Sequence, residues 1–314
     1  MKNRISKLVV LLCVIVLLAA ASVPAMASNV MDTSADCSLT VNYNDPDDGS
    51  PIVGAGFALF LVAKPGNGAY ELTGSFKNMP VELKELDTAA MADMAKTIEA
   101  LAALYGIAPT ESGKTDEKGV YAVDGLEAGL YLLRGYNHSQ NGRSYTTSPV
   151  LIYLPGYDEA EGQWVYDVEI SAKSKVKPED GGKVERKVLK VWKDDGSERP
   201  KEITVHLLRN GETFDTVTLS ARNGWSHTWK DLEEDSYWMV AEDVPKDYTV
   251  TVAQEGITFV MTNTKPGTPP PPPPPPPDLP QTGQLWWPIP LLAAAGLVMF
   301  VTGYVRNRGK RDEN

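Results

Sequence analysis

Residues 188–200 read VLKVWKDDGSERP, and this stretch decides how the C-terminal half of the chain folds. Its opening residues favour a β-strand, and DDGSERP is a turn that ends the strand. Because successive side chains of a strand point to opposite faces, Val188, Lys190 and Trp192 share one face. A lysine therefore stands among apolar residues. The opposite face also carries Leu189 and Val191, so the pattern alone leaves the inward face ambiguous.

The residues that follow repeat this alternation of strand and turn as far as Lys265. Short alternating runs are separated by RNGE, ARNG and VPKD, which predicts a β-sandwich of about 80 residues with one small core. The run 257–264 puts Asn263 on the face of its apolar residues, and the run 238–244 does the same for Glu242. The sequence can thus place a lysine, a glutamate and an asparagine on core-facing positions of three strands.

Burial would change the chemistry of these three residues. Desolvation drives a buried lysine toward its neutral amine and a buried glutamate toward its neutral acid. A neutral amine is a nucleophile, and a protonated carboxyl polarises a carbonyl and relays protons. Lys190 held against Asn263 could then displace ammonia and form an amide, with Glu242 as the acid. The pattern leaves a second interpretation equally open, in which both charges lie on the surface and Asn263 at a strand end.

Residues 184–265 resemble the B-type repeat of collagen-adhesin proteins. The stretches that carry the resemblance are VLKVWKDDGSERP, ITVHLLRNGE, VTLSARNGW, WKDL, VAEDVPKDY and FVMTNT. That family is a small immunoglobulin-like sandwich, often fastened by a Lys–Asn isopeptide bond with a catalytic acid. The resemblance implies that Lys190 and Asn263 form this bond and that Glu242 is the acid. The reaction would be a single intramolecular turnover, so we expect no enzyme activity.

Residues 36–172 are predicted to form another immunoglobulin-like sandwich, which precedes the one in residues 184–265 in tandem. Its strand-like runs are CSLTVNY, AGFALFLVAK, GVYAVDGL, GLYLLRGY, TSPVLIYL and WVYDVEIS. Residues 87–106 differ, because apolar residues recur there at helical spacing, with Asp87 or Thr88 to cap the start and Gly106 to end it. We expect this helical insertion to pack over one sheet edge, and a partner-binding surface is the alternative. Residues 173–183 are assigned to a linker.

The first predicted sandwich resembles the N-terminal domain of Gram-positive pilins, in residues 56–60, 115–119 and 129–131. Pilin subunits also carry W-x-x-x-V-x-V-Y-P-K, whose lysine receives the threonine carbonyl of the next subunit. The residues at these spacings are Trp164, Val168, Ile170 and Lys173. The resemblance makes Lys173 the candidate intersubunit acceptor. Ser171 and Ala172 stand where Tyr and Pro are expected, so an ordinary linker lysine is the alternative, and Lys175 and Lys177 lie close by.

Both ends of the chain carry targeting patterns. Residues 1–27 have a basic start, an apolar run and the small-x-small site AMA, which is typical of a secretory signal peptide. Nine consecutive prolines, residues 269–277 of the segment 266–278, predict a polyproline II spacer of about 28 Å. Residues 285–305 are nearly long enough, and apolar enough, for a transmembrane helix, and a basic tail follows them.

Residues 279–314 resemble the sorting signal of Gram-positive surface proteins. The motif itself is Leu279, Pro280, Gln281, Thr282 and Gly283. The resemblance implies that a sortase cuts between Thr282 and Gly283. The threonine carbonyl would then pass to an amine of the peptidoglycan precursor or to a lysine of another protein. The chain would be secreted, retained briefly by residues 285–305 and anchored covalently to the cell wall.

The composition excludes several classes of function and site. Of 30 basic and 41 acidic residues, 23 and 39 lie between residues 28 and 282, a net charge of −16, which argues against nucleic-acid binding. Cys37 is the one cysteine after the signal peptide, so no intramolecular disulfide is expected. We expect no cofactor and no metal. The three histidines lack ligand spacing, and residues 45–50 (DPDDGS) lack the full calcium-loop pattern.

These patterns favour a structural protein, a basal or ancillary pilin that joins other pilin subunits to peptidoglycan. Two alternatives stay open. One is a shaft pilin polymerised through Lys173, and the other is a monomeric surface adhesin for a host ligand. The sequence identifies neither the partner pilin, nor the sortase, nor a host ligand.

Overall fold

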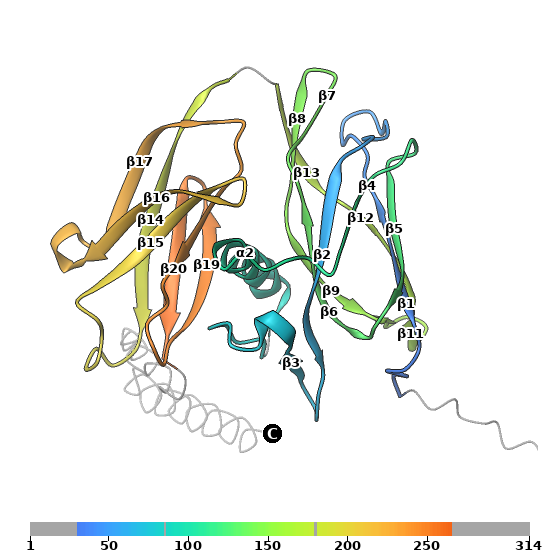
Figure 1. Cartoon of the computed structure of the whole chain (residues 1–314), viewed down its shortest axis with the longest axis horizontal. Coiled ribbons are helices and arrows are strands. Elements are labelled where there is room, and N and C mark those ends of the chain that lie inside the picture. The colour runs from blue at the N-terminus through green and yellow to red at the C-terminus, as the bar shows by residue number, and fades with distance from the viewer. Residues whose placement is uncertain (1–29, 85, 179–180, 266–314) are drawn as a thin grey trace, which may run out of the picture. The chain divides into compact units, whose positions relative to one another are not determined.

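The computed structural model describes residues 30–84, 86–178 and 181–265 (Figure 1). The predicted signal peptide (residues 1–27), proline spacer (266–278) and sorting signal (279–314, with its apolar segment 285–305) lie outside the described residues. So do the motif residues Leu279, Pro280, Gln281, Thr282 and Gly283. Within the described ranges, no helix combines the length and the apolar character needed to cross a membrane. All described residues belong to one compact unit, Met1–Thr268.

The fold is mainly β, as the sequence predicts, and the strands fall into two groups. The first group is β1 Cys37–Asn42, β2 Gly56–Pro65, β3 Tyr70–Leu72, β4 Glu111–Lys114, β5 Val120–Leu126, β6 Gly129–Gly135, β7 His138–Gln140, β8 Arg143–Thr147, β9 Val150–Leu154, β10 Gly156–Asp158, β11 Gln163–Val165, β12 Asp167–Ser171 and β13 Ser174–Pro178. Its larger sheets have the strand orders β12-β1-β5, β13-β8-β7 and β3-β2-β6-β9, with β4 on β2.

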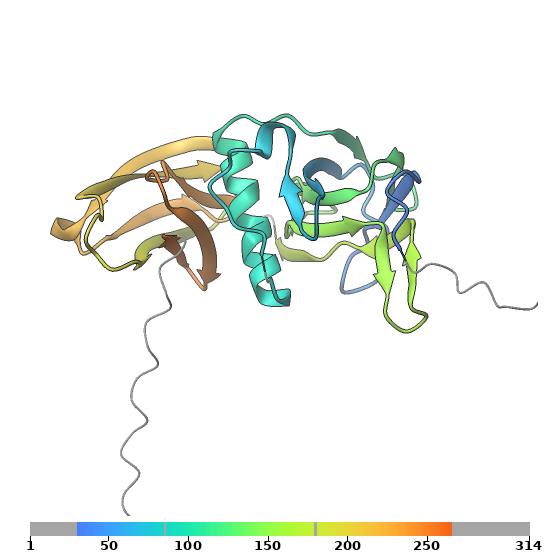
Figure 2. The same ribbon diagram turned by 90° about the horizontal axis from the view of Figure 1, so that it is seen from below.

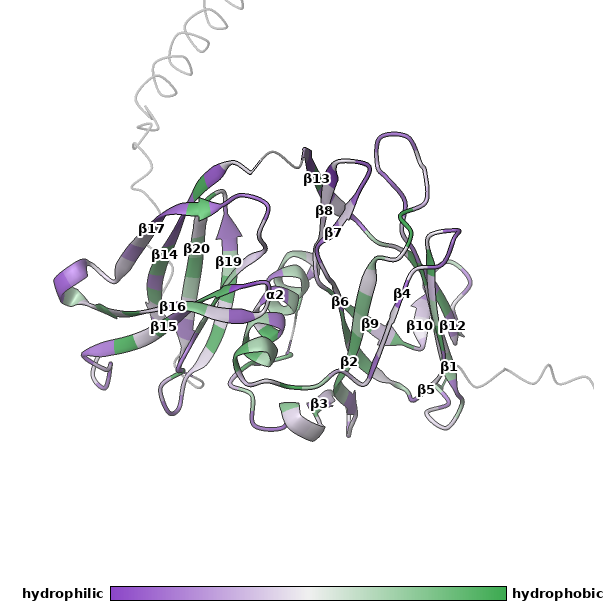
Figure 3. Cartoon of the chain, turned by 45° about the horizontal axis from the view of Figure 1, so that its top comes forward, coloured by the Kyte–Doolittle hydropathy of each residue, from purple (hydrophilic) through white to green (hydrophobic). Residues whose placement is uncertain are grey.

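These sheets pack on one another through strands in which alternate residues are buried. In β1 every second residue is buried, and Leu39 and Val41 are fully inaccessible to solvent. The ring of Phe57 stacks on Tyr121 at 5.8 Å and meets Tyr43 edge-on at 5.4 Å. Buried side chains from β1, β2, β5, β6 and β9 share one core. Figure 3 shows hydrophobic and hydrophilic bands along the strands and mainly hydrophilic residues in the connecting loops.

The second group follows residue 181. It consists of β14 Lys183–Lys193, β15 Glu202–Arg209, β16 Glu212–Ser220, β17 Ser226–Glu233, β18 Trp238–Glu242, β19 Thr249–Glu255 and β20 Thr258–Thr264. One sheet has the order β17-β14-β20-β19 and the other β16-β15-β18. Val188 and Met261 of the first sheet and Leu207 and Val240 of the second are buried in a common core. The first and last strands of this sandwich, β14 and β20, are parallel neighbours.

The predicted helical insertion is present as α2 Thr88–Leu104. The side chain of Asp87 caps it by accepting a hydrogen bond from the Ala90 amide at 2.8 Å. Gly106 follows the helix with φ +62°, a left-handed conformation that glycine adopts without strain. Short 3₁₀ turns occupy Gly74–Phe76 and Ala221–Asn223.

Helix α2 packs over a sheet edge, and that edge belongs to the second group of strands. Edge strand β19 donates the Val250 amide to the carbonyl of Pro80 and the Val252 amide to Thr97 Oγ1, both at 2.8 Å. Figures 1 and 2 show α2 beside β19. The helix and the loop before it thus satisfy backbone donors that an edge strand would otherwise leave open.

The predicted linker, residues 173–183, is shorter in the structure. Residues 174–178 form β13, which pairs antiparallel with β8 and places Val176 opposite Tyr145. Val176 packs against the first core while Lys175 points to solvent. This period-2 alternation adds a strand to the first group, because one apolar residue between polar ones is enough for an edge position.

A buried acid joins the two groups of strands. Glu99 of α2 is 1% exposed and accepts a hydrogen bond from the Tyr237 hydroxyl, just before β18, at 2.6 Å. Arg134 of β6 lies on its other side, with Nε 3.3 Å from Glu99 Oε1. Desolvation raises the pKa of Glu99 to about 7, although both partners oppose this rise.

We expect the stability of the chain to depend on the protonation of Glu99. Its pKa in the folded state, about 7, exceeds the ordinary glutamate value of 4.5, so the folded state holds the proton more tightly. This contribution is complete below pH 4.5 and is lost as the pH rises through 7, on the order of 3 kcal/mol in the free energy of unfolding. Glu99→Gln should flatten this pH dependence in denaturant titrations.

Glu127→Gln is the matched control, because that glutamate is mainly exposed and should leave the slope unchanged. Equal pH slopes for the wild type and Glu99→Gln would contradict the assignment.

Candidate functional site

Lys190 lies in the core of the second sandwich. Strand β14 pairs with β17 on one side and β20 on the other, so its backbone groups are satisfied across the sheet. Val188 and Lys190 are its two buried residues, and the Lys190 side chain has no exposed surface. The face predicted from VLKVW is therefore the inward one, and the ambiguity left by Leu189 and Val191 is resolved.

Glu242 and Asn263 face the same core. In β20 every second residue is buried, which places Phe259, Met261 and Asn263 inward. All five residues of β18 are buried, and Glu242 ends that strand with no exposed area. Lys190 and Asn263 thus come from neighbouring strands of one sheet and Glu242 from the facing sheet. The surface interpretation of these charges is wrong for this structure.

The lysine and the glutamate are in direct contact. Lys190 Nζ donates to Glu242 Oε2 at 2.8 Å, and both side chains are 0% exposed. Met261 is the residue directly across from Lys190 in the parallel pair, so Asn263 lies one inward position further along. Its amide makes no hydrogen bond through Nδ2 or Oδ1, and Glu242 Oε1 is also buried without a partner.

Burial sets the charge state of the pair. Desolvation lowers the pKa of Lys190 to about 8, and the nearby Glu242 carboxylate only partly offsets this. Desolvation also raises the pKa of Glu242, against the opposing effects of Lys190 and the neighbouring Asn263. Asn263 is therefore close enough to influence Glu242 even though its amide forms no hydrogen bond of normal geometry. Both shifts favour the neutral amine and the neutral acid.

These properties supply the parts of an acyl transfer to nitrogen. The amine is a nucleophile when neutral, the asparagine amide is an electrophile, and the acid can polarise the amide carbonyl. The three buried atoms without partners each carry a desolvation cost of about 1–3 kcal/mol. Unsatisfied buried polar atoms are rare in native proteins, and three of the eight found among the described residues belong to Glu242 and Asn263.

Lys173 is exposed and lies two residues after β12. Its backbone is held on both sides, because the Ala172 amide donates to Asn42 O at 2.9 Å and the Ser148 amide donates to Lys173 O at 3.3 Å. Lys173 also lines the rim of a largely apolar groove of about 790 Å³ between α2 and β9. Its amine is thus accessible on a fixed support.

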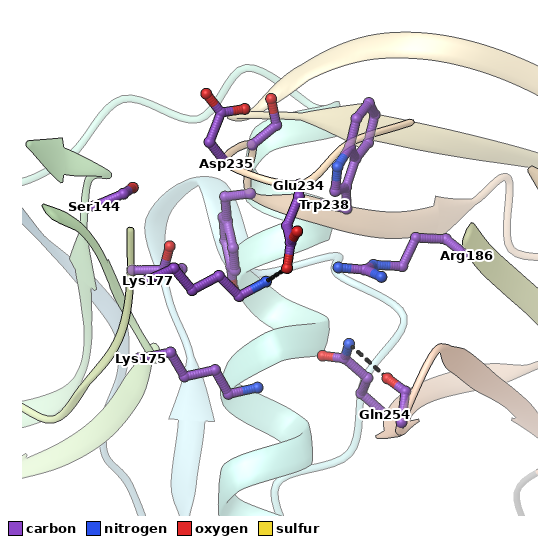
Figure 4. Close-up of a pocket in the computed structure, with 12 residues that line it drawn as sticks. Ser144, Lys175, Lys177, Arg186, Glu234, Asp235, Trp238 and Gln254 are labelled. Carbon is purple, nitrogen blue, oxygen red and sulfur yellow. Dashed lines mark hydrogen bonds and ion pairs between the residues drawn. The ribbon is translucent and has the colours of Figure 1, made fainter. Parts of the chain in front are cut away.

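The neighbouring lysines of β13 differ from one another. Lys177 Nζ lies 2.6 Å from Glu234 Oε1, and both line a pocket of about 190 Å³ (Figure 4). Lys175 is exposed at the same pocket, and the guanidinium of Arg186 points into it. The contact with Glu234 leaves the Lys177 amine less accessible than that of Lys173.

The remaining candidates form no site among the described residues. Asp45 is buried and accepts hydrogen bonds from the Tyr145 hydroxyl at 2.6 Å and from Arg143 Nη1 at 2.5 Å. These internal hydrogen bonds occupy the Asp45 carboxylate. Within residues 30–84, 86–178 and 181–265, no group of His, Cys, Asp and Glu residues could hold a metal ion. The ring of His227 packs edge-on against Trp229, with the ring centres 4.8 Å apart.

Sequence reasoning missed the aromatic residues around Lys190. Trp192, Trp225 and Tyr248 come from three separate segments, and the rings of Trp225 and Tyr248 meet Trp192 edge-on at centroid distances of 5.3 Å. A tryptophan two positions after a core lysine was the available signal, since both side chains share a face.

The comparisons with known proteins find a match to this part of the chain. Residues 186–264 match the family model described as "Cna protein B-type domain". A collagen adhesin of Staphylococcus aureus is 34% identical over 77 residues, which is 22% of this chain and 6% of that protein. The chain thus spans a small fraction of the curated relative, and the match identifies a domain.

Solved structures of similar proteins include a single B repeat unit of a collagen binding surface protein of S. aureus and the full-length major pilin SpaD of Corynebacterium diphtheriae. The first is 17% identical, covering 75% of this chain and 99% of that chain, with a TM-score of 0.26. The second is 13% identical, covering 76% and 99%, with a TM-score of 0.29. At these TM-scores the superpositions are poor, and the assignment rests on the domain match.

Proposed function

We propose that Lys190 and Asn263 are joined by an isopeptide bond and that Glu242 is the acid that assists its formation. The observation that supports this most strongly is the fully buried Lys190–Glu242 contact beside an asparagine amide without hydrogen-bond partners. Lys190 Nζ attacks Cγ of Asn263, the Cγ–Nδ2 bond breaks, and Nδ2 leaves as ammonia. Glu242 donates a hydrogen bond to Oδ1 and relays one amine proton to the departing nitrogen.

The bond also accounts for the unsatisfied atoms. Nδ2 is absent from the product, and the Oδ1 carbonyl can accept from protonated Glu242 Oε1. The cost of three buried atoms without partners is thereby removed. The cross-link encloses residues 190–263, most of this sandwich, and constrains the unfolded chain as a disulfide across a long loop does, by about 4 kcal/mol.

The first expected outcome concerns mass. The purified chain should be lighter by one ammonia than the mass calculated for the residues it contains, and a proteolytic digest should contain a branched peptide joining Lys190 to Asn263. Glu242→Ala removes the acid that assists the reaction, so the bond should not form. The variant should therefore keep the mass of the ammonia and have a lower Tm. Asn263→Ala is the control that cannot form the bond yet removes both unsatisfied amide atoms. A wild-type chain at full sequence mass would exclude the isopeptide bond.

On a larger scale, we infer a structural, non-enzymatic role at the cell surface, with the body held by its C-terminal end. The B-type domain match supports a surface protein of the pilin or adhesin kind. The motif Leu279-Pro280-Gln281-Thr282-Gly283 supports attachment of Thr282 to peptidoglycan by a sortase. The proline run would then carry the body away from the wall.

Lys173 gives this role a second covalent connection. An acyl-enzyme must reach the acceptor amine, and Lys173 is exposed, held by its backbone and at the rim of an apolar groove. One acceptor lysine and one sorting signal fit a basal or ancillary pilin that ends a pilus and ties it to the wall. A surface adhesin for a host ligand is the second candidate, because the curated relative is named a collagen adhesin.

The second expected outcome concerns Lys173. In the native host, Lys173→Ala should abolish the covalent adduct with the partner pilin while the protein still reaches the wall through Thr282. Thr282→Ala should have the opposite effect. The adduct with the partner pilin still forms, but it is released into the medium because it is not attached to the wall. Lys175→Ala is the matched control, since that lysine is equally exposed and two residues away.

Immunoblots of wall extracts and mass spectrometry of the adduct measure both effects. An adduct that persists in Lys173→Ala would assign the acceptor to another lysine, and a single sharp band in the wild type would favour the adhesin.

A further inference from the structure

We propose that Trp192 is a positioning residue for the cross-linking reaction, which holds the Lys190 amine beside Glu242 and keeps water out of the site. The inference rests on the proposed isopeptide bond and adds a residue to its mechanism. Lys190 Nζ lies 4.8 Å from the centre of the Trp192 ring. Trp192 is therefore in contact with the nucleophile itself.

Trp192 separates a dry site from the surface. The Lys190 side chain is fully buried, whereas the Arg199 side chain, whose guanidinium carbon lies 5.4 Å from the centre of the same ring, is 34% exposed. The rings of Trp225 and Tyr248 meet Trp192 edge-on, with interplanar angles of 79° and 74°. The three rings, here called the aromatic cover, close the end of the core at which Lys190 lies.

The aromatic cover is anchored from outside. The Tyr248 hydroxyl donates to Asp194 Oδ2 at 2.8 Å, and Arg199 pairs with the same carboxylate. The Asp194 side chain is 1% exposed, so the DDGSERP turn is tied down at its start. Without these anchors a turn of this composition would be free to swing away from the core.

Trp225 adds evidence of constraint. It has φ +55°, a left-handed conformation that a bulky side chain rarely adopts. Its carbonyl accepts a hydrogen bond from the Lys190 amide at 2.8 Å, and its ring packs on Trp192. Strained backbone persists where the surroundings impose it, often beside functional groups. Here the strained residue fixes both the backbone of the nucleophile and the ring that covers it.

The indole nitrogen has no part in this arrangement. Trp192 Nε1 is buried without a hydrogen-bond partner in the described structure. The ring therefore acts through its face and its bulk, so phenylalanine should replace it with little loss. This separates a positioning role from a hydrogen-bonding role.

Two effects of the ring oppose one another. The ring face attracts the ammonium form, which favours the charged lysine. Exclusion of water favours the neutral amine, and this effect dominates, because the pKa of Lys190 falls to about 8 with desolvation as the largest cause. At pH 7 about one lysine in ten is then neutral, against roughly one in three thousand for a lysine of ordinary pKa. Removing the aromatic cover should therefore slow bond formation.

The test follows ammonia loss by intact mass in freshly synthesised full chains, sampled over time between pH 6 and 9. Trp192→Leu should form the bond at least about tenfold more slowly at pH 7, with the midpoint of its pH profile moved upward. Trp192→Phe should restore a rate and a profile close to those of the wild type. Tyr248→Leu keeps Trp192 but removes its neighbour, and should show a smaller change in the same direction.

A direct measurement removes any dependence on folding rate. In the Asn263→Ala background no bond forms, and NMR titration reports the Lys190 pKa in the folded chain, which should rise when Trp192→Leu is added. An unchanged rate, profile and pKa in both Trp192→Leu and Tyr248→Leu would overturn the role of Trp192 while leaving the isopeptide bond intact. A wild-type chain that never loses ammonia would instead overturn the proposed bond.

Discussion

The desolvation of one lysine and one glutamate is the constraint on which the second sandwich depends. A buried ion pair rarely repays the cost of taking two charges out of water, and apolar residues of similar volume are often at least as stable. The contact between Lys190 and Glu242 is therefore a poor choice if stability comes only from noncovalent packing. Its presence beside an unpaired amide is explained if the charges are transient and are consumed by a reaction.

The topology determines which residues can meet. Strands β14 and β20 are far apart in sequence but are parallel neighbours, so their inward side chains lie side by side. Glu242 approaches from the facing sheet, at the end of β18, and its Oε2 accepts a hydrogen bond from the Lys190 amine. Alternating burial in β20 is what turns Asn263 inward, so a shift by one residue would expose it to solvent.

Much of this could be predicted from the sequence, and the failures have physical reasons. Alternation gave the inward positions of Glu242 and Asn263, and the cap at Asp87 gave the start of α2. The strand in residues 174–178 was missed because its single apolar residue, Val176, is too weak a signal. The sequence pattern also does not predict which side chains of distant segments come into contact.

Glu99 illustrates that last limit. Nothing in the pattern of a helix predicts that one of its acids will be buried against Tyr237 and Arg134, since those partners come from two other parts of the fold. The same holds for Trp225, whose left-handed backbone follows from tertiary packing and opposes its own local preference. The identities of the residues at the candidate site were readable, whereas the cover that closes it required the structure.

The direction of load explains why one cross-link would suffice. If force enters at Lys173 and leaves through the C-terminal end, it runs along β13 and β14 and then reaches the bond between Lys190 and Asn263. Nearly all of the first group of strands precedes Lys173 in the chain and lies outside that path. It therefore needs no covalent fastening, and Cys37, the one cysteine among the described residues, is buried and free. In the second sandwich the load would bypass residues 191–262, so its hydrogen bonds would bear little of it.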